Sequence, residues 1–200
     1  MTDAQIAAAA IPVVHRGIVC LPMDRDRADM ARQIIDRYPP HLCVLVNEIG
    51  IRTVLIGPFQ KYRDYSKRLR RLRVDRWQKP PLGVFVAAER ALYVLYPSPA
   101  VVAHEYAHAI DCALGGGDYF SVAHAGVRRA FRAAHKRKAF ITPHAGIGVD
   151  EYFAEGMRAM VGVYEDEHSW PPVSPELLRE VDPTLYTLLE RIWRAPPGRV

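Results

Sequence analysis

The sequence has little cysteine and no long hydrophobic run. Its three cysteines, Cys20, Cys43 and Cys112, are odd in number and far apart, and none belongs to a CxxC pair. This pattern suggests neither a disulfide framework nor a thiolate zinc site. No stretch approaches the roughly 18 apolar residues of a membrane span, and the first residues lack the basic segment of a signal peptide. We therefore expect no membrane partner and a cytoplasmic protein, or one exported without a recognisable signal peptide.

The sequence also has only a small excess of positive over negative charge. The 200 residues carry a net charge of +5, and half of them are hydrophobic, which suits one domain over residues 1–200 with a sizeable core. Strand-like segments come early and helical ones late, so the expected fold class is α+β. The patterns predict strands at 41–47, 51–57 and 82–96 (with a hairpin at 87–89) and helices at 24–40, 61–77, 98–117, 118–138, 150–164 and 182–193.

The segment VVAHEYAHAID, residues 101–111, carries the strongest chemical signal. A spacing of four residues brings His104 and His108 onto one helix face, a turn apart, so both imidazoles can bind one metal ion. Glu105 is offset from that face, where it can contact a metal-bound water instead of the metal. This is the HExxH pattern, two ligands plus a general base. The alternative is a helix whose two histidines are merely structural.

A catalytic zinc usually has three protein ligands, and the third one distinguishes the candidate classes. The metzincin pattern requires glycine and histidine where this sequence has Asp111 and Leu114. A thermolysin-like glutamate is excluded as well, because residues 126–138 contain no acid. The next carboxylates along the sequence are Asp150, Glu151 and Glu155.

Glu151 and Glu155 lie four residues apart and therefore share a helix face. One of them can bind a metal while the other supports the site from behind. The alternative is a solvent-facing acidic pair. Because Tyr152, Phe153 and Met157 are apolar, a carboxylate buried among them needs a cation or a metal as partner. Together with the HExxH pattern, this favours the metal interpretation.

The segments HEYAHAID and, some forty residues later, DEYFAEGMRAM resemble two groups of gluzincin metallopeptidases. These are the catalytic domain of anthrax lethal factor and the related bacterial Pro-Pro endopeptidases. The resemblance covers about residues 80–165. It implies a zincin-like fold with a small mixed sheet, an edge strand beside the HExxH helix and a helical C-terminal half. It also implies a Zn²⁺ cofactor and a zinc-dependent endopeptidase that acts on a peptide or protein substrate.

The resemblance further implies a role for each matching residue. The zinc ligands would be His104, His108 and Glu151, the general base Glu105, and the supporting residues around them Asp111 and Glu155. The sequence departs from the family at one position, seven residues before the glutamate ligand, where His144 replaces a catalytic tyrosine. Either His144 donates a hydrogen bond to the developing oxyanion in place of the phenol, or the site is impaired.

Two basic runs support a competing interpretation. Residues 61–76 contain eight Lys or Arg against two acids, with two tyrosines interleaved, and 128–138 is also basic. The alternative function is thus a non-catalytic binding or regulatory module that contacts nucleic acid through these helices. A solvated face of an amphipathic helix explains the charge as well, so nucleic acid is not the expected partner, and both runs also suit acidic peptides. The strand at 83–96 is either a plain edge strand or one that pairs with an extended substrate.

Several properties stay open at this point. A metallopeptidase outside the gluzincin group that acts on one protein partner fits the HExxH pattern too. Divalent ions other than zinc also accept two histidines and a glutamate. The sequence does not specify the cleavage site or the oligomeric state.

Overall fold

The computed structural model describes residues 12–15, 17–163 and 171–195. Its strands form one five-stranded sheet in the order β1-β2-β3-β5-β4. They are β1 (Val13–His15), β2 (Ile18–Cys20), β3 (Arg52–Leu55), β4 (Gly83–Val86) and β5 (Ala91–Val94). Strands β2, β3 and β5 are parallel, whereas β1 and β4 run antiparallel to their neighbours. The sheet is therefore mixed, and within the described residues β4 forms one of its edges.

Helices make up most of the remaining structure. The α-helices are α2 (Arg25–Ile35), α3 (Pro40–Glu48), α4 (Tyr62–Tyr65), α5 (Lys67–Leu72), α6 (Pro99–Leu114), α7 (Phe120–Ala123), α8 (Ala125–Arg137), α9 (Val149–Val161), α10 (Pro175–Val181) and α11 (Pro183–Arg194). Short 3-10 turns are η1 (Pro22–Asp24), η2 (Val74–Arg76), η3 (Ala87–Glu89) and η4 (His144–Gly146). The expected α+β class, with early strands and a helical C-terminal half, is confirmed.

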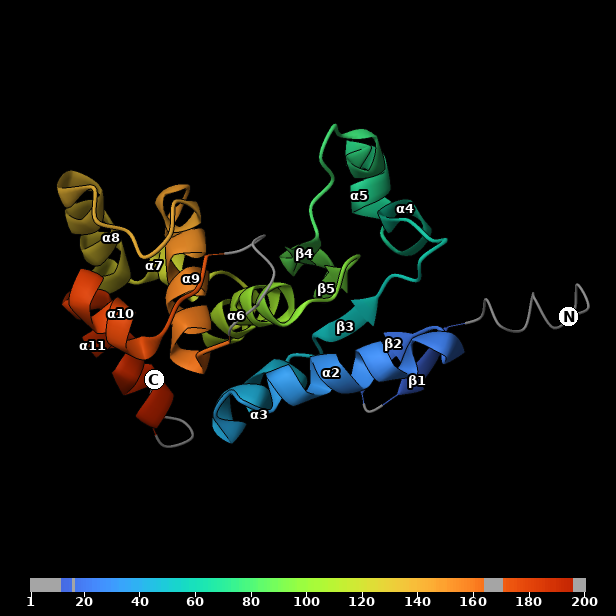
Figure 1. Ribbon diagram of the computed structural model, residues 1–200, viewed down its shortest axis with the longest axis horizontal. Helices are drawn as coiled ribbons and strands as arrows, with labels where there is room; N and C mark the ends of the chain where they lie inside the picture. The colour runs from blue at the N-terminus through green and yellow to red at the C-terminus, as the bar shows by residue number, and fades with distance from the viewer. Residues whose placement is uncertain (1–11, 16, 164–170, 196–200) are drawn as a thin grey trace, which may run out of the picture.

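Helix α6 runs through the middle of the molecule, with the sheet on one side and α8 to α11 on the other (Figure 1). The Ser98 hydroxyl accepts a hydrogen bond from the Val101 N–H, and Pro99 occupies the first turn, where its missing N–H leaves nothing unpaired. Residues 100–113 are all buried. A helix that is mostly apolar around its circumference must be enclosed in this way.

The two faces of the sheet bury different cores. Successive side chains of a strand point to opposite faces, so Leu92 and Val94 of β5 pack into the large core that contains α6. Ala91 and Tyr93 of the same strand pack into a smaller core with residues of α4, α5 and η2. The sheet thus separates the HExxH helix from the basic segment 61–76.

Residues 41–47, which were predicted as a strand, form helix α3 instead. Pro40 occupies the first turn of this helix, where its fixed φ is already helical. Leu42, Cys43 and Val46 are buried along one helix face. A short apolar run has the same appearance in a buried helix and in a buried strand, which explains the wrong prediction.

Two predicted helices are interrupted by extended residues. Ser66 separates α4 from α5, and His124 separates α7 from α8. Each of these side chains accepts a hydrogen bond from the N–H three residues ahead and so starts a new helix.

The hairpin at 87–89 is confirmed. The helix predicted at 150–164 begins at Val149, after Gly148, so Asp150 lies in its first turn; residue 164 lies outside the described residues.

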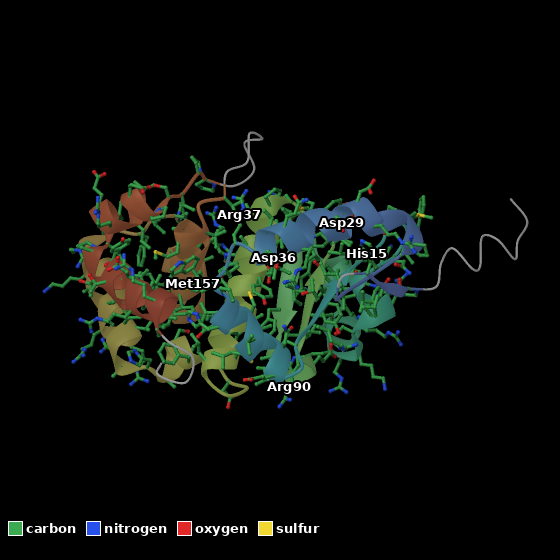
Figure 2. The ribbon with its side chains drawn as sticks, turned by 90° about the horizontal axis from the view of Figure 1, so that it is seen from below. His15, Asp29, Asp36, Arg37, Arg90 and Met157 are labelled. Atoms are coloured by element: carbon green, nitrogen blue, oxygen red, sulfur yellow. The ribbon has the colours of Figure 1, made fainter. Side chains whose placement is uncertain are left out.

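Contacts near the sheet tie its peripheral elements together (Figure 2). His15 Nε2 lies 2.9 Å from Asp29 Oδ1, which links β1 to α2. Arg90 Nη1 donates to the Ile49 carbonyl oxygen at 2.9 Å and links the β4–β5 turn to the end of α3.

The three cysteines are buried and free of disulfides. Among the described residues, no helix is both long and apolar enough to cross a membrane.

Candidate metal centre

Three of the predicted site residues meet where α6 and α9 pack together. His104 and His108 are only 2% and 5% exposed, and their Nε2 atoms lie 3.2 Å apart. Glu151, from the first turn of α9, places its Oε2 atom 3.1 Å from His104 Nε2 and 3.3 Å from His108 Nε2. One ligand atom from each side chain fits within a 4.8 Å span, so these residues can hold a metal ion.

The contacts of Glu151 Oε2 fit a shared cation better than direct hydrogen bonding. This oxygen also lies 3.0 Å from His144 Nε2, yet it is buried and has no hydrogen-bond partner within the described residues. Burial alone would raise the pKa of Glu151, but the three imidazoles outweigh it and hold that pKa far below its usual value. Two imidazole nitrogens and one carboxylate oxygen form a donor set that suits zinc.

Glu105 follows His104 on α6 and is also buried, beside the edge strand. Its side chain packs against β4. Gly83 allows this approach, because a Cβ atom there would come within 2.7 Å of Glu105 Cγ and 2.9 Å of Val101 Cγ1. Desolvation by burial raises the pKa of Glu105, and the nearby histidines and the backbone amide of Phe85 in β4 oppose the shift. The close packing of β4 on α6 therefore fixes this carboxylate next to the triad.

Glu155 stands one turn behind Glu151 and is fully buried. Its Oε1 atom lies 2.7 Å from His104 Nδ1, so the remaining ring nitrogen of His104 has a carboxylate partner. Such a partner fixes the orientation of a metal-binding imidazole. Burial would raise the pKa of Glu155, but the hydrogen bonds from His104 and Arg158 keep it well below its usual value.

Two further residues that the sequence analysis did not single out complete this network. Arg158, 1% exposed, donates through Nε to Glu155 Oε1 at 3.1 Å and through Nη2 to Oε2 at 2.9 Å. The Thr142 hydroxyl donates to Glu155 Oε2 at 2.8 Å. The i,i+3 spacing of Glu155 and Arg158 in an apolar helix is a signal that would have found the arginine. Thr142 comes from a loop and has no comparable signal.

Asp111 is buried, but its hydrogen bonds go to Ser121 and not to the triad. Its two oxygens accept hydrogen bonds from the Ser121 N–H at 2.7 Å and the Ser121 hydroxyl at 2.5 Å. These bonds fasten α7 to the end of α6. Burial raises the pKa of Asp111 to about 6, against the effect of the bonds from Ser121. His108 Nδ1 is buried without a hydrogen-bond partner in the described part of the chain, unlike the outer nitrogen of His104.

His144 lies at the rim of the site, on η4. Its side chain is 40% exposed, and its ring centroid lies 5.2 Å from that of His104. The Thr142 hydroxyl accepts a hydrogen bond from the Ala145 N–H at 3.2 Å and so shapes the turn that carries His144. The position where the sequence departs from the family pattern is therefore in contact with the triad.

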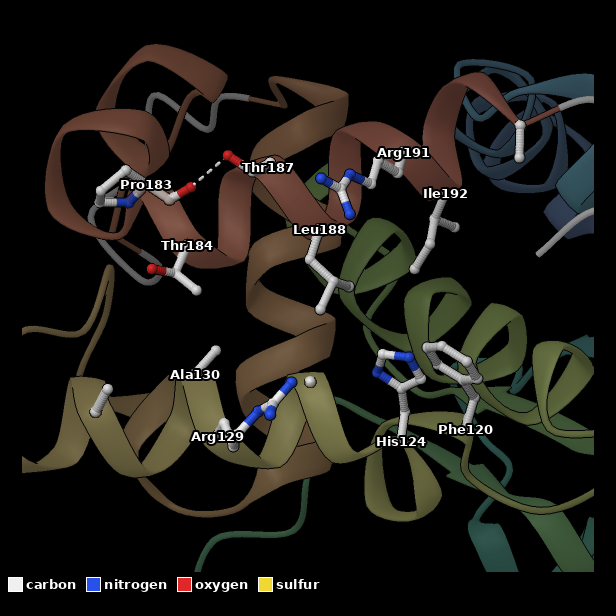
Figure 3. A pocket seen from close by; sticks show the side chains of 13 residues that line it. Phe120, His124, Arg129, Ala130, Pro183, Thr184, Thr187, Leu188, Arg191 and Ile192 are labelled. Atoms are coloured by element: carbon white, nitrogen blue, oxygen red, sulfur yellow. Dashed lines mark hydrogen bonds between the residues drawn. The ribbon is translucent and has the colours of Figure 1, made fainter.

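A cleft of about 460 Å³ opens over these residues. It is lined by residues 80–85, which include most of β4, and also by Tyr119, His144 and Asp150. A larger hollow of about 1080 Å³ lies between α8 and α11, with Arg129 and Arg191 at its sides (Figure 3). None of the predicted site residues lines that larger hollow. The smaller cleft is the one that joins the triad to solvent.

Comparison with known proteins gives a likeness among the solved structures. No protein-family model matches the chain, and no curated protein matches it. Among solved structures, the chain is similar to the Pro-Pro endopeptidase PPEP-2 from Paenibacillus alvei, with a TM-score of 0.59 and 17% sequence identity. The match covers 88% of this chain and 97% of that chain. At this identity the likeness shows a shared mixed α+β fold. The neighbour belongs to one of the two groups that the sequence motifs resemble.

Proposed function

We propose that this chain is a zinc-dependent endopeptidase of the gluzincin type. The observation that carries the proposal is the convergence of His104, His108 and Glu151 beside the buried Glu105, at the floor of a cleft walled by an edge strand. The fold shared with a Pro-Pro endopeptidase supports it. We assign His104, His108 and Glu151 as metal ligands because their three donor atoms surround one point and have the chemistry that zinc prefers.

Zinc, when bound there, would polarise the scissile carbonyl and lower the pKa of a water molecule. Glu105 then accepts the proton of the attacking water and returns it to the leaving amine. The packing of the Glu105 side chain against Gly83 of β4 holds the carboxylate in place for both steps. Glu155 holds the His104 ring in the orientation in which Nε2 faces Glu151.

His144 takes the position of the missing tyrosine in this proposal. Its imidazole is at the rim of the cleft and next to Glu151, where an N–H can donate to the oxyanion of the tetrahedral intermediate. The substrate is a peptide or protein whose extended backbone lies along β4, which pairs with β5 on only one side in the described residues. Asp111 acts at a distance by holding α7, and with it the wall near Tyr119.

The test combines metal analysis with peptide cleavage. Purified wild-type protein is expected to hold about one zinc per chain, and Glu151→Ala to lose most of it, because one of three protein ligands is removed. Glu105→Gln is expected to keep its zinc and to lose about 100-fold or more in cleavage of a peptide library that includes Pro-Pro sequences. Glu48→Gln, at an exposed position on α3, is the matched control and is expected to change neither quantity.

Equal cleavage by the wild type and Glu105→Gln would contradict the proposed mechanism. His144→Ala separates the two roles considered for that residue. A loss of about 100-fold in kcat with zinc retained fits an oxyanion donor. An unchanged kcat would remove His144 from the catalytic residues and leave the remaining assignment intact.

A further inference from the structure

The segment 61–76 holds more positive charge than the chain as a whole. It has eight basic and two acidic residues, a net charge of +6, while the chain has +5. The other 184 residues therefore carry 19 basic and 20 acidic side chains, a net charge of −1. This segment forms α4, α5 and η2, and it is one of two strongly basic runs; the other, residues 128–138, lies largely on α8 and has six basic residues and no acid.

Five side chains of this segment form an exposed surface that we call the basic strip. They are Lys67, Arg68, Arg71, Arg73 and Arg76, all exposed on α5, η2 and the residue between them. None of the five takes part in a salt bridge with another described residue. Like charges held this close repel one another, so their juxtaposition is unfavourable until an anion neutralises it.

Three carboxylates on or bonded to this segment already accept hydrogen bonds from other groups. Asp64 and Asp75 accept hydrogen bonds from backbone N–H groups of residues 61–63. Glu89 accepts one from the Arg68 N–H and another from a tyrosine hydroxyl. These acids shape the backbone of the segment and leave its guanidinium groups exposed. The basic strip is thus suited to a negatively charged partner from outside.

The tyrosines of the segment are not available for stacking against bases. Tyr62 is fully buried, and its hydroxyl donates to the Pro81 carbonyl oxygen at 2.7 Å. Tyr65 is half-buried and donates to the Gln60 side chain. Binding of single-stranded nucleic acid relies on exposed aromatic faces beside the positive charge. Neither tyrosine offers such a face, and Trp77, the exposed aromatic residue that directly follows the segment, lines the cleft; this favours an acidic polypeptide over single-stranded nucleic acid.

The basic strip is physically connected to the cleft. The bond from Tyr62 to Pro81 anchors α4 to the cleft wall. The chain leaves η2 at Trp77, which is 52% exposed and lines the cleft, and descends to β4 beside α6 (Figure 1). Burial raises the pKa of Tyr62, and the negative charge of Glu105 raises it further.

We propose that the basic strip binds an acidic stretch of polypeptide whose adjoining residues enter the cleft along Trp77 and β4. This inference rests on the proposed endopeptidase function, since it assigns the acidic stretch to the substrate. The basic strip supplies charge attraction and a faster encounter, while the cleft supplies the contacts to the scissile bond. Its contribution falls at high salt because the strip is exposed.

The experiment measures binding separately from cleavage. The full chain with Glu105→Gln is titrated against fluorescein-labelled deca-glutamate, and fluorescence anisotropy is recorded at low and high salt. One variant adds Arg68→Glu, Arg71→Glu and Arg76→Glu. The matched control adds the same charge change on α8, at the exposed Arg129, Arg132 and Lys136. Circular dichroism establishes that both variants are folded. At about 50 mM salt we expect binding at least about tenfold weaker in the strip variant and changed less than about twofold in the control.

Equal loss of binding in both variants would overturn the inference, because the net charge of the protein alone would then explain the binding. The absence of binding by the parent would overturn it as well, because there would then be no site. Tighter binding of deca-thymidylate through the same arginines would replace the polypeptide with nucleic acid. A second measurement uses any library peptide that the active chain cleaves, with and without a flank of four glutamates. The flank is expected to lower KM in the wild type only, with kcat unchanged. A chain that binds deca-glutamate but cleaves nothing would refute the proposed function and keep the acidic-peptide surface.

Discussion

Replacing Arg158 with methionine removes the only arginine that contacts Glu155 within the described residues. The two side chains are 1% and 0% exposed and are joined by two charge-assisted hydrogen bonds. Methionine is apolar and of similar length, so it occupies much of the same space. The variant would leave the Glu155 carboxylate buried, with His104 and Thr142 as its remaining partners.

The magnitude follows from the cost of an uncompensated buried charge. Removing one partner of a buried ion pair typically costs about 3–5 kcal/mol, because the other charge keeps its desolvation penalty. We expect Arg158→Met to lower the free energy of unfolding by about this amount. Replacing both partners by Arg158→Met with Glu155→Gln removes the stranded charge. The double variant is therefore expected to recover about 1–3 kcal/mol relative to the sum of the single variants.

Urea unfolding at neutral pH, followed by circular dichroism, measures these differences. A chelator in the buffer prevents metal binding from adding to the apparent stability. Arg129→Met, at an exposed position on α8, is the control and is expected to change stability by less than about 0.5 kcal/mol. A loss below about 1 kcal/mol for Arg158→Met would refute the reasoning, since the pair would then be either hydrated or replaceable.

The triad could be predicted from the sequence because its geometry is mostly local. The spacing of His104 and His108 fixes their common face within one helix, whatever the rest of the fold does. The position of Glu151 depends on how α9 packs on α6, and periodicity gives no information on that packing. The elimination of other acids left both Glu151 and Glu155 open as ligands, and the choice of Glu151 followed from the family resemblance carried by DEYFAEGMRAM. The structure places the glutamate against both histidines.

The supporting contacts could not be predicted, because they join segments far apart in the sequence. Nothing in the sequence distinguishes Gly83 from any other strand glycine. Its contact with the Glu105 side chain appears only in the structure. Thr142 acts through a turn that has no periodic pattern. The error at 41–47 has a different origin, since a short apolar run fits a helix and a strand equally until its length and partners are known. Local patterns thus predicted the residues that converge in the triad better than the contacts that surround them.

Three further changes test the surroundings of the site and of the basic strip. Gly83→Ala would bring a Cβ atom to 2.7 Å from Glu105 Cγ, so we expect a loss of about 1–3 kcal/mol in urea unfolding and slower peptide cleavage. An unchanged rate would show that the carboxylate tolerates displacement. Thr142→Val breaks the bond to Glu155 Oε2 and is expected to cost about 1–3 kcal/mol, while Thr142→Ser retains stability because it keeps the hydroxyl. Glu89 tests a pH effect: burial would raise its pKa, but hydrogen bonds from neighbouring side-chain and backbone donors lower it below 4.5 in the folded state. A carboxyl whose folded pKa is depressed contributes stability above its unfolded pKa and loses that contribution as the pH falls through the folded value. Glu89→Gln should therefore destabilise the protein at pH 7, and the difference from wild type should shrink in acid. The same difference at both pH values would mean that hydrogen bonding to the neutral amide, rather than charge, determines the contribution of this side chain.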